Sequence, residues 1–335
     1  MNPPWFDDSE SDDEDWLSES IRKYKHFFRY KFENTPLQIK IHPKGKYLLL
    51  LCETIKKNYE ILVFKIPEKI LAISEKEEGL INSRELTLVC GCHESRKILD
   101  INFDPNEELS VLILFPNGLE KFKQKTKHSD LLISEVKFEG LSGNKIGTSD
   151  QGHVYIIGEK IQFVDSDQTL SFTDFNAMDL LTYFSEKDVL EKWCIAKSDM
   201  IEILKSNGES LIKVGLKGKR FKELKLRKIG QDIHFIAQDC LDQLFHGIIS
   251  ESDLNLVTVD FQDELKKMVW IDDTKILVIQ NKALKVIEIT SGKILFTHET
   301  SKKATEITSI ALHPTLSKLI ACCDDSRAVE IFCYE

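Results

Sequence analysis

Short apolar runs separated by polar turns recur along most of the chain, and the clearest set lies in residues 306–335. The runs there extend from Ile307 to Leu312, from Leu319 to Cys323 and from Ala328 to Tyr334. A His-Pro turn separates the first two runs, and an acidic turn separates the last two. Apolar runs of this length, bounded by turn residues, are typical of strands. The segment therefore predicts three antiparallel strands joined by tight turns.

The same unit recurs upstream, marked by an apolar-x-apolar pair followed by His or Asp and then Pro. Copies end at Pro43, Pro105 and Pro314. About 209 residues separate Pro105 from Pro314, which is five steps of about 42, the period of a four-stranded propeller blade. Degenerate copies fill the gap, one of them joining Ile133 to Phe138 with Ile146 to Ile157. The repeats predict an all-β fold, a seven-bladed β-propeller of four-stranded blades over residues 24–335.

An alternating segment precedes the first repeat. Phe28, Tyr30 and Phe32 alternate with charged residues between positions 24 and 33, which is the pattern of a half-buried strand. The last repeat supplies only three strands. We therefore expect this N-terminal strand to complete the final blade and close the propeller, which removes free sheet edges.

The repeat resembles that of the WD-repeat propeller family, over roughly residues 24–335. Acidic or glycine turns stand at the matching hairpins, and a Gly-x-His sequence echoes the Gly-His dipeptide of that family. The residues concerned are Asp150, Gln151, Gly152, Asp324, Asp325, Gly91, Cys92 and His93. The Trp-Asp dipeptide does not occur. The resemblance thus implies the architecture and not the hydrogen-bond network of the family, and a propeller outside the family stays an alternative.

The first twenty residues carry eight acidic residues and no basic one, whereas the whole chain has 55 acidic and 45 basic residues. The rest of the chain is therefore close to neutral. Such a block predicts a disordered, extended acidic tail over residues 1–20. It is either a solubilising tail or a short motif that docks on a basic partner, in which case we expect contacts from Trp5, Phe6, Asp12, Asp13 and Trp16.

A second charged segment, residues 217–228, holds seven basic residues and one acidic residue. It could bind phosphate groups or an acidic protein. Phe221, Leu224 and Leu226 are interleaved with the charges, so the pattern equally describes an exposed outer strand with a solvated edge, the interpretation we favour. If the segment binds a partner, the expected contacts are Lys219, Arg220, Lys222, Arg227 and Lys228.

Several classes of protein are disfavoured by the sequence. It has no run of 18 apolar residues, so we expect no membrane span. Its first residues lack the basic and apolar regions of a secretory signal. Its eight cysteines are scattered, which favours a reducing compartment. Phosphate-loop, dinucleotide and hydrolase motifs are missing. Cys90, Cys92 and His93 lack a second ligand pair, so we expect structural thiols. We therefore predict no catalytic, cofactor-binding or metal-binding residues.

Function is inferred from this architecture. Rigid surfaces without an assembled catalytic group favour a non-enzymatic scaffold or adaptor of a larger intracellular complex. The acidic tail favours a nuclear location, with the cytoplasm as the alternative, and a nuclear pore or ribosome-assembly complex. The single propeller ending on its last strand also looks like the small propeller nucleoporins of the outer pore ring. One alternative is a non-catalytic partner of an RNA-modifying enzyme that contacts RNA through residues 217–228; another is an enzyme whose site the sequence does not show.

Overall fold

A computed structural model describes thirteen stretches of the chain. They are residues 25–68, 86–126, 129–148, 152–158, 160–164, 169–171, 178–184, 190–205, 209–250, 253–280, 282–300, 304–316 and 318–334. The predicted acidic tail, residues 1–20, lies outside them. The described chain is all-β and forms seven four-stranded antiparallel sheets. The predicted fold class, a seven-bladed β-propeller, is therefore confirmed.

The chain forms two compact units. The first consists of residues 1–146 and 300–335, and the second consists of residues 147–299. In the first unit, one blade has the strand order β1-β28-β27-β26, and two further blades run consecutively from β2 to β5 and from β6 to β9. Its strands are β1 (Lys25–Lys31), β2 (Thr35–Ile41), β3 (Tyr47–Glu53), β4 (Tyr59–Lys65), β5 (Thr87–Glu94), β6 (Asp100–Phe103), β7 (Ser110–Phe115), β8 (Gly118–Gln124), β9 (Leu132–Glu139), β26 (Ile307–Leu312), β27 (Leu319–Asp324) and β28 (Ala328–Cys333).

The second unit begins within β10 and contains four blades of consecutive strands. Its strands are β10 (Lys145–Thr148), β11 (Val154–Ile157), β12 (Lys160–Phe163), β13 (Thr169–Ser171), β14 (Asp179–Phe184), β15 (Leu190–Ala196), β16 (Met200–Lys205), β17 (Ser210–Gly215), β18 (Phe221–Ile229), β19 (Asp232–Asp239), β20 (Gln243–Ser250), β21 (Asp253–Gln262), β22 (Lys267–Trp270), β23 (Lys275–Gln280), β24 (Ala283–Glu288) and β25 (Ile294–Glu299).

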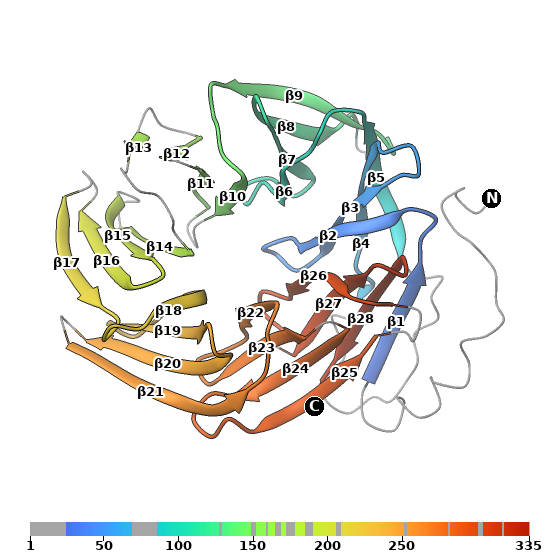
Figure 1. The fold of residues 1–335 in the computed structure, drawn as a ribbon. Coiled ribbons are helices and arrows are strands. Elements are labelled where there is room, and N and C mark those ends of the chain that lie inside the picture. Colours follow the sequence, from blue (N-terminus) through green and yellow to red (C-terminus); the bar gives the residue numbers. More distant parts are fainter. Residues whose placement is uncertain are drawn as a thin grey trace. The chain divides into compact units, whose positions relative to one another are not determined.

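The N-terminal strand completes the last blade, as predicted. β1 pairs antiparallel with β28 from Lys25 opposite Cys333 to Lys31 opposite Ala328, and Figure 1 shows the two strands side by side. Phe32 follows β1 and enters a core cluster that includes Phe64 of β4 and Val329 of β28. The first described strand is thus joined to the last one by backbone hydrogen bonds and by apolar packing.

Apolar packing between neighbouring blades forms the core of each unit. In the first unit, Leu49 of β3 and Ile113 of β7 belong to one cluster of buried residues. In the second, Ile201 of β16 and Phe235 of β19 belong to another. The second strands of several blades are buried on both faces, as in β7, where all six residues are buried. Burial on both faces explains why these strands are continuous apolar runs.

Side chains of the repeated His-Pro and Asp-Pro positions cap the turns between the first two strands of their blades. His42 Nδ1 accepts a hydrogen bond from the backbone N–H of Lys44 at 3.0 Å. Asp104 Oδ1 accepts one from Asn106 at 2.9 Å, and His313 Nδ1 accepts one from Leu316 at 3.0 Å. The side chains at these repeated positions therefore stabilise the turns.

Blade boundaries are where the sequence-based prediction was wrong. Ile133 to Phe138 belongs to β9, the outer strand of the β6–β9 blade, and not to the blade that contains Ile146 to Ile157. Residues 221–229 form β18, the first strand of their blade, and β18 contacts the first strands β14 and β22 of the neighbouring blades. They do not form an outer strand. An apolar alternation identifies a strand but not its position within the sheet, because a first strand such as β18 can show the same alternation of buried and exposed residues as an outer strand.

Candidate partner-binding pocket

A tight turn between β3 and β4 forms one wall of the candidate site. Asn58 N–H donates to Thr54 Oγ1 at 3.1 Å, and Thr54 N–H donates to the Asn58 carbonyl at 2.9 Å. Lys57 adopts a left-handed conformation with φ of 63°, and its ammonium pairs with Glu53 at 3.0 Å. The turn holds Ile55 out into solvent, where 84% of the residue is exposed.

Below this turn lies a pocket of about 590 Å³ in the first unit. Its walls come from the β1–β2 connection, the β3–β4 turn, strands β4 and β5, and the residue after β5. The lining residues are Asn34, Thr54, Ile55, Lys56, Asn58, Glu60, His93, Glu94 and Ser95. A pocket of this volume can hold one or two side chains of a partner.

Glu60 forms the charged floor of the pocket. It lies on β4 directly opposite His93 of β5, and only 5% of the residue is exposed. Asn34 Nδ2 donates to Glu60 Oε2 at 2.6 Å, and His93 Nδ1 lies 3.3 Å from Glu60 Oε1. Three segments that are separate in the sequence therefore meet at one carboxylate.

Glu94, the second acidic residue of the pocket, belongs to a separate ion-pair network. Arg96 donates to Glu94 Oε2 at 2.6 Å and to Glu120 Oε1 at 2.5 Å. Its guanidinium carbon lies 3.9 Å from the centroid of the Phe115 ring. Hydrogen bonds from Arg96 lower the pKa of the Glu94 and Glu120 carboxyl groups. The negative charge of Glu94 is therefore already balanced within the protein.

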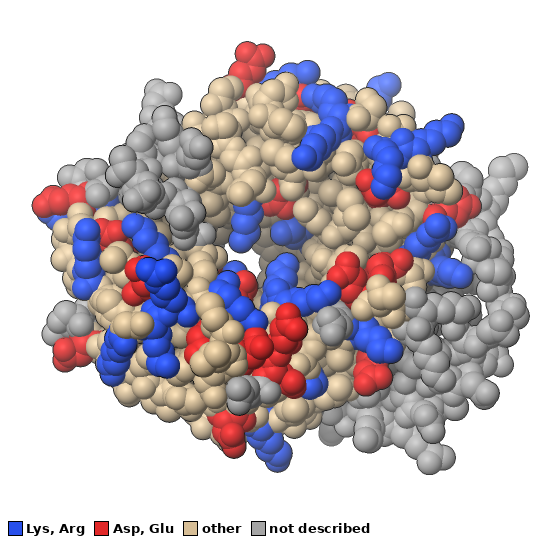
Figure 2. Space-filling model, in the orientation of Figure 1, with Lys and Arg blue, Asp and Glu red and all other residues tan. Residues whose placement is uncertain are grey.

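Several bases of the 217–228 segment are engaged in local contacts in the second unit. Lys222 pairs with Asp242, and Arg227 Nε lies 2.8 Å from Asp273 Oδ1. The Lys219 ammonium lies 4.3 Å from the centroid of the Phe245 ring. On the face drawn in Figure 2, basic and acidic side chains are interspersed. These contacts neutralise or occupy part of the positive charge that a phosphate ligand would need.

Four bases of that segment, Lys217, Arg220, Lys222 and Lys228, are exposed. Arg220 precedes β18 and has no ion-pair partner among the described residues, and Lys228 lies near the end of β18. The proposed contact residues of the tail, Trp5, Phe6, Asp12, Asp13 and Trp16, lie outside the described residues. Partner binding by either group stays a prediction.

The thiols singled out in the sequence lie close to the pocket but do not line it. Cys90 is buried, Cys92 is half-buried, and both are free. Burial raises the pKa of each thiol to about 12, so both are protonated at neutral pH. His93 lines the pocket, whereas the sequence analysis considered it only as a possible metal ligand.

Glu60 and Asn34 were missed by sequence analysis. One signal for Glu60 was available, because it is the single acidic residue in the otherwise apolar interior of β4, Tyr59–Lys65. A charge at such a position is unfavourable unless it is paired. Asn34 carries no comparable signal, since a polar residue between two strands is ordinary.

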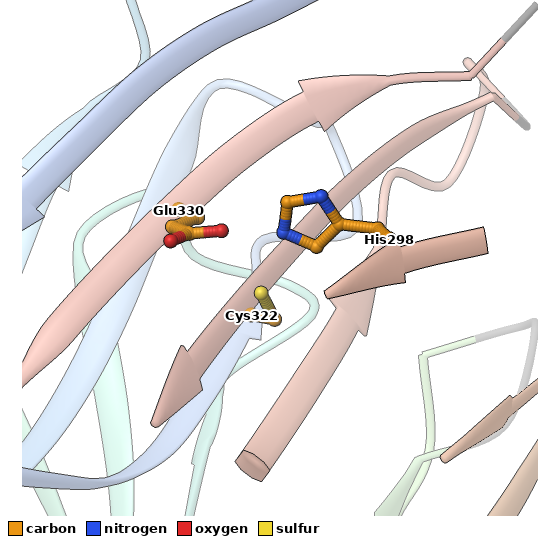
Figure 3. A group of neighbouring side chains, drawn as sticks. All are labelled: His298, Cys322 and Glu330. Carbon is orange, nitrogen blue, oxygen red and sulfur yellow. The ribbon is translucent and has the colours of Figure 1, made fainter. Parts of the chain in front are cut away.

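Another buried polar pair lies in the last blade. Cys322 of β27 and Glu330 of β28 are opposite each other in the register, and each is 1% exposed. Figure 3 shows these two side chains on neighbouring strands. His298, drawn in the same figure, is a buried residue of β25 in the second unit. The Cys322–Glu330 pair has no opening toward a described pocket and belongs to the interior of its unit.

The fold places this chain among the β-propellers, a class whose blades are commonly used to bind other proteins. No protein-family model matches the chain, and a search of curated proteins found no match. Within the described residues, no helix has the length and apolar character needed to cross a bilayer.

Proposed function

We propose that this protein is a non-enzymatic scaffold or adaptor subunit of a larger assembly, and a divergent member of the WD-repeat class. The observation that carries the proposal is the pocket on the β2–β5 blade, in which a rigid sheet and a tight turn hold a buried carboxylate beneath an exposed apolar residue. An exposed anchor beside a preformed charged pocket is an arrangement that suits recognition of another protein.

The chemistry of the pocket supports binding over catalysis. One oxygen of Glu60 accepts a hydrogen bond from Asn34, the other lies 3.3 Å from His93 Nδ1, and Glu94 is held by Arg96. The pocket thus positions charge and does not present an activated group.

The eight acidic residues in positions 1–20 support a basic partner and a nuclear assembly, such as a nuclear pore or ribosome-assembly complex. A role beside an RNA-modifying enzyme receives less support, because Lys222 and Arg227 of the basic segment are paired with Asp242 and Asp273. Long-range attraction between the tail and a basic partner would be screened at high salt.

Purification of the tagged full-length chain from cells, followed by mass spectrometry, tests the proposal. We expect stoichiometric recovery of the subunits of one complex, in the nuclear fraction. Recovery of an RNA-modifying enzyme as the dominant partner would favour the alternative role. A purified protein that converts a small substrate without any partner would overturn the scaffold proposal.

A further inference from the structure

The floor of the pocket carries a negative charge without a permanent counter-ion. Among the described residues, Glu60 has no lysine or arginine nitrogen within 4.0 Å; its partners are the neutral Asn34 amide and the His93 imidazole. The pocket contains one cationic residue, Lys56, which stands exposed in the β3–β4 turn. Glu60 differs in this respect from Glu94, which is paired with Arg96.

Burial of an uncompensated carboxylate is unfavourable, because water that would solvate the charge is displaced. The hydrogen bond from Asn34 and the nearby His93 imidazole offset part of that cost for Glu60, and each carboxylate oxygen can accept more than one hydrogen bond. Glu60 lines a pocket of about 590 Å³. A cation entering this cavity would therefore find a desolvated carboxylate, which binds positive charge more strongly than one in water.

We propose that this pocket binds the side-chain cation of a lysine or arginine from a partner polypeptide, with Glu60 as its counter-ion. The proposal rests on the scaffold function proposed above and names the chemistry of the partner at this surface. The alkyl stem of the incoming side chain would pack on Ile55, which is 84% exposed. Apolar contact along the stem of a long basic side chain is common, while its charged end seeks a polar partner.

The neighbouring network shows that this blade edge already accommodates such a group. Arg96 sits between the carboxylates of Glu94 and Glu120, with its guanidinium over the Phe115 ring. That intramolecular arrangement combines charge pairing with apolar contact. The pocket at Glu60 and Ile55 offers the same two elements to a residue supplied from outside.

Three short peptides test the proposal by isothermal titration calorimetry with the full chain. They are Ac-Gly-Arg-Gly-amide, Ac-Gly-Lys-Gly-amide and the norleucine analogue, which keeps the alkyl stem and lacks the charge. We expect a cationic peptide to bind and the norleucine peptide to bind at least about tenfold more weakly, since a hydrogen bond to a charged group is worth about 10- to 100-fold in affinity. The relative affinities of the first two peptides distinguish arginine from lysine.

Matched variants locate the binding. Glu60→Gln preserves the shape of the side chain and should weaken the cationic peptide about 10- to 100-fold. Glu53→Gln makes the same change of charge nearby, on a residue that pairs with Lys57 and does not line the pocket. It should change the affinity less than about twofold. Lys56→Gln should strengthen binding a few-fold, because a like charge at the rim is removed.

Unchanged affinity in Glu60→Gln, or equal binding of the norleucine peptide, would overturn the proposal. Circular dichroism and thermal unfolding of each variant verify that the fold is retained. Failure here is distinct from failure of the scaffold function. If the partner complex is recovered equally with wild-type and Glu60→Gln protein, the scaffold function stands and this pocket is not its binding site.

Discussion

Replacement of Phe32 by alanine tests whether the N-terminal segment is part of the folded core. Phe32 is 3% exposed, and its ring centroid lies 5.8 Å from that of Phe64 in an edge-to-face arrangement. Loss of a buried phenylalanine side chain costs about 3–5 kcal/mol, because apolar burial is lost and a cavity remains. We therefore expect Phe32→Ala to lower the free energy of unfolding by about 3–5 kcal/mol.

Urea unfolding followed by tryptophan fluorescence and far-ultraviolet circular dichroism measures the effect. The control is Lys31→Ala, the preceding and exposed position, which should change stability by less than about 0.5 kcal/mol. Deletion of residues 1–20 should leave unfolding unchanged, whereas deletion through Glu33 also removes β1 and should destabilise the last blade severely. Similar stability of Phe32→Ala and Lys31→Ala, or of the two truncations, would refute the role assigned to this segment.

Further predictions concern the turns and the histidines. Alanine at Gly45 should destabilise the protein by about 2–4 kcal/mol, because a positive φ of 73° is strained for alanine and the new methyl group would meet the His313 ring. Gly218→Ala, with φ of 74° and open space around it, should cost only about 1 kcal/mol in the same thermal or urea assay; equal costs would contradict the predicted clash. Burial, with a smaller contribution from neighbouring His234, lowers the pKa of His246 to about 4. As the pH falls, His246 is therefore protonated in the unfolded chain before it is protonated in the folded protein. Its contribution to the free energy of unfolding is fully present above pH 6.5 and is lost as the pH falls toward 4. The loss is about 1–2 kcal/mol after discounting for partial exposure. Stability measured across this range should vary less in His246→Gln; an unaltered slope would exclude the histidine as its source.

Much of the fold was available from local patterns in the sequence. The last blade illustrates this, because the predicted and observed first strands both run from Ile307 to Leu312. Proline residues after His42, Asp104 and His313 marked the turns. The spacing from Pro105 to Pro314 gave the blade period, and counting all the copies gave the number of blades. These features were readable because strand alternation and turn chemistry depend on neighbouring residues along the chain.

The position of each strand within its blade required the tertiary structure. The basic strand β18 has the alternation of an exposed edge, yet it is the first strand of its blade and contacts β14 and β22. Lys222 and Arg227 pair with Asp242 and Asp273, which are distant in sequence. Charge composition alone overstated the positive charge available to a ligand, since ion pairing depends on which strands become neighbours.

The candidate pocket was decided almost entirely by the tertiary structure. Asn34, Glu60 and His93 come from a connection and two different strands, and they meet because β4 and β5 pair in one register while β1 returns to the last blade. The sequence by itself determined the strands, their period and the unfavourable charge within β4. Which side chains converge on that charge depends on inter-strand register and packing between blades, and no local spacing along the chain encodes either.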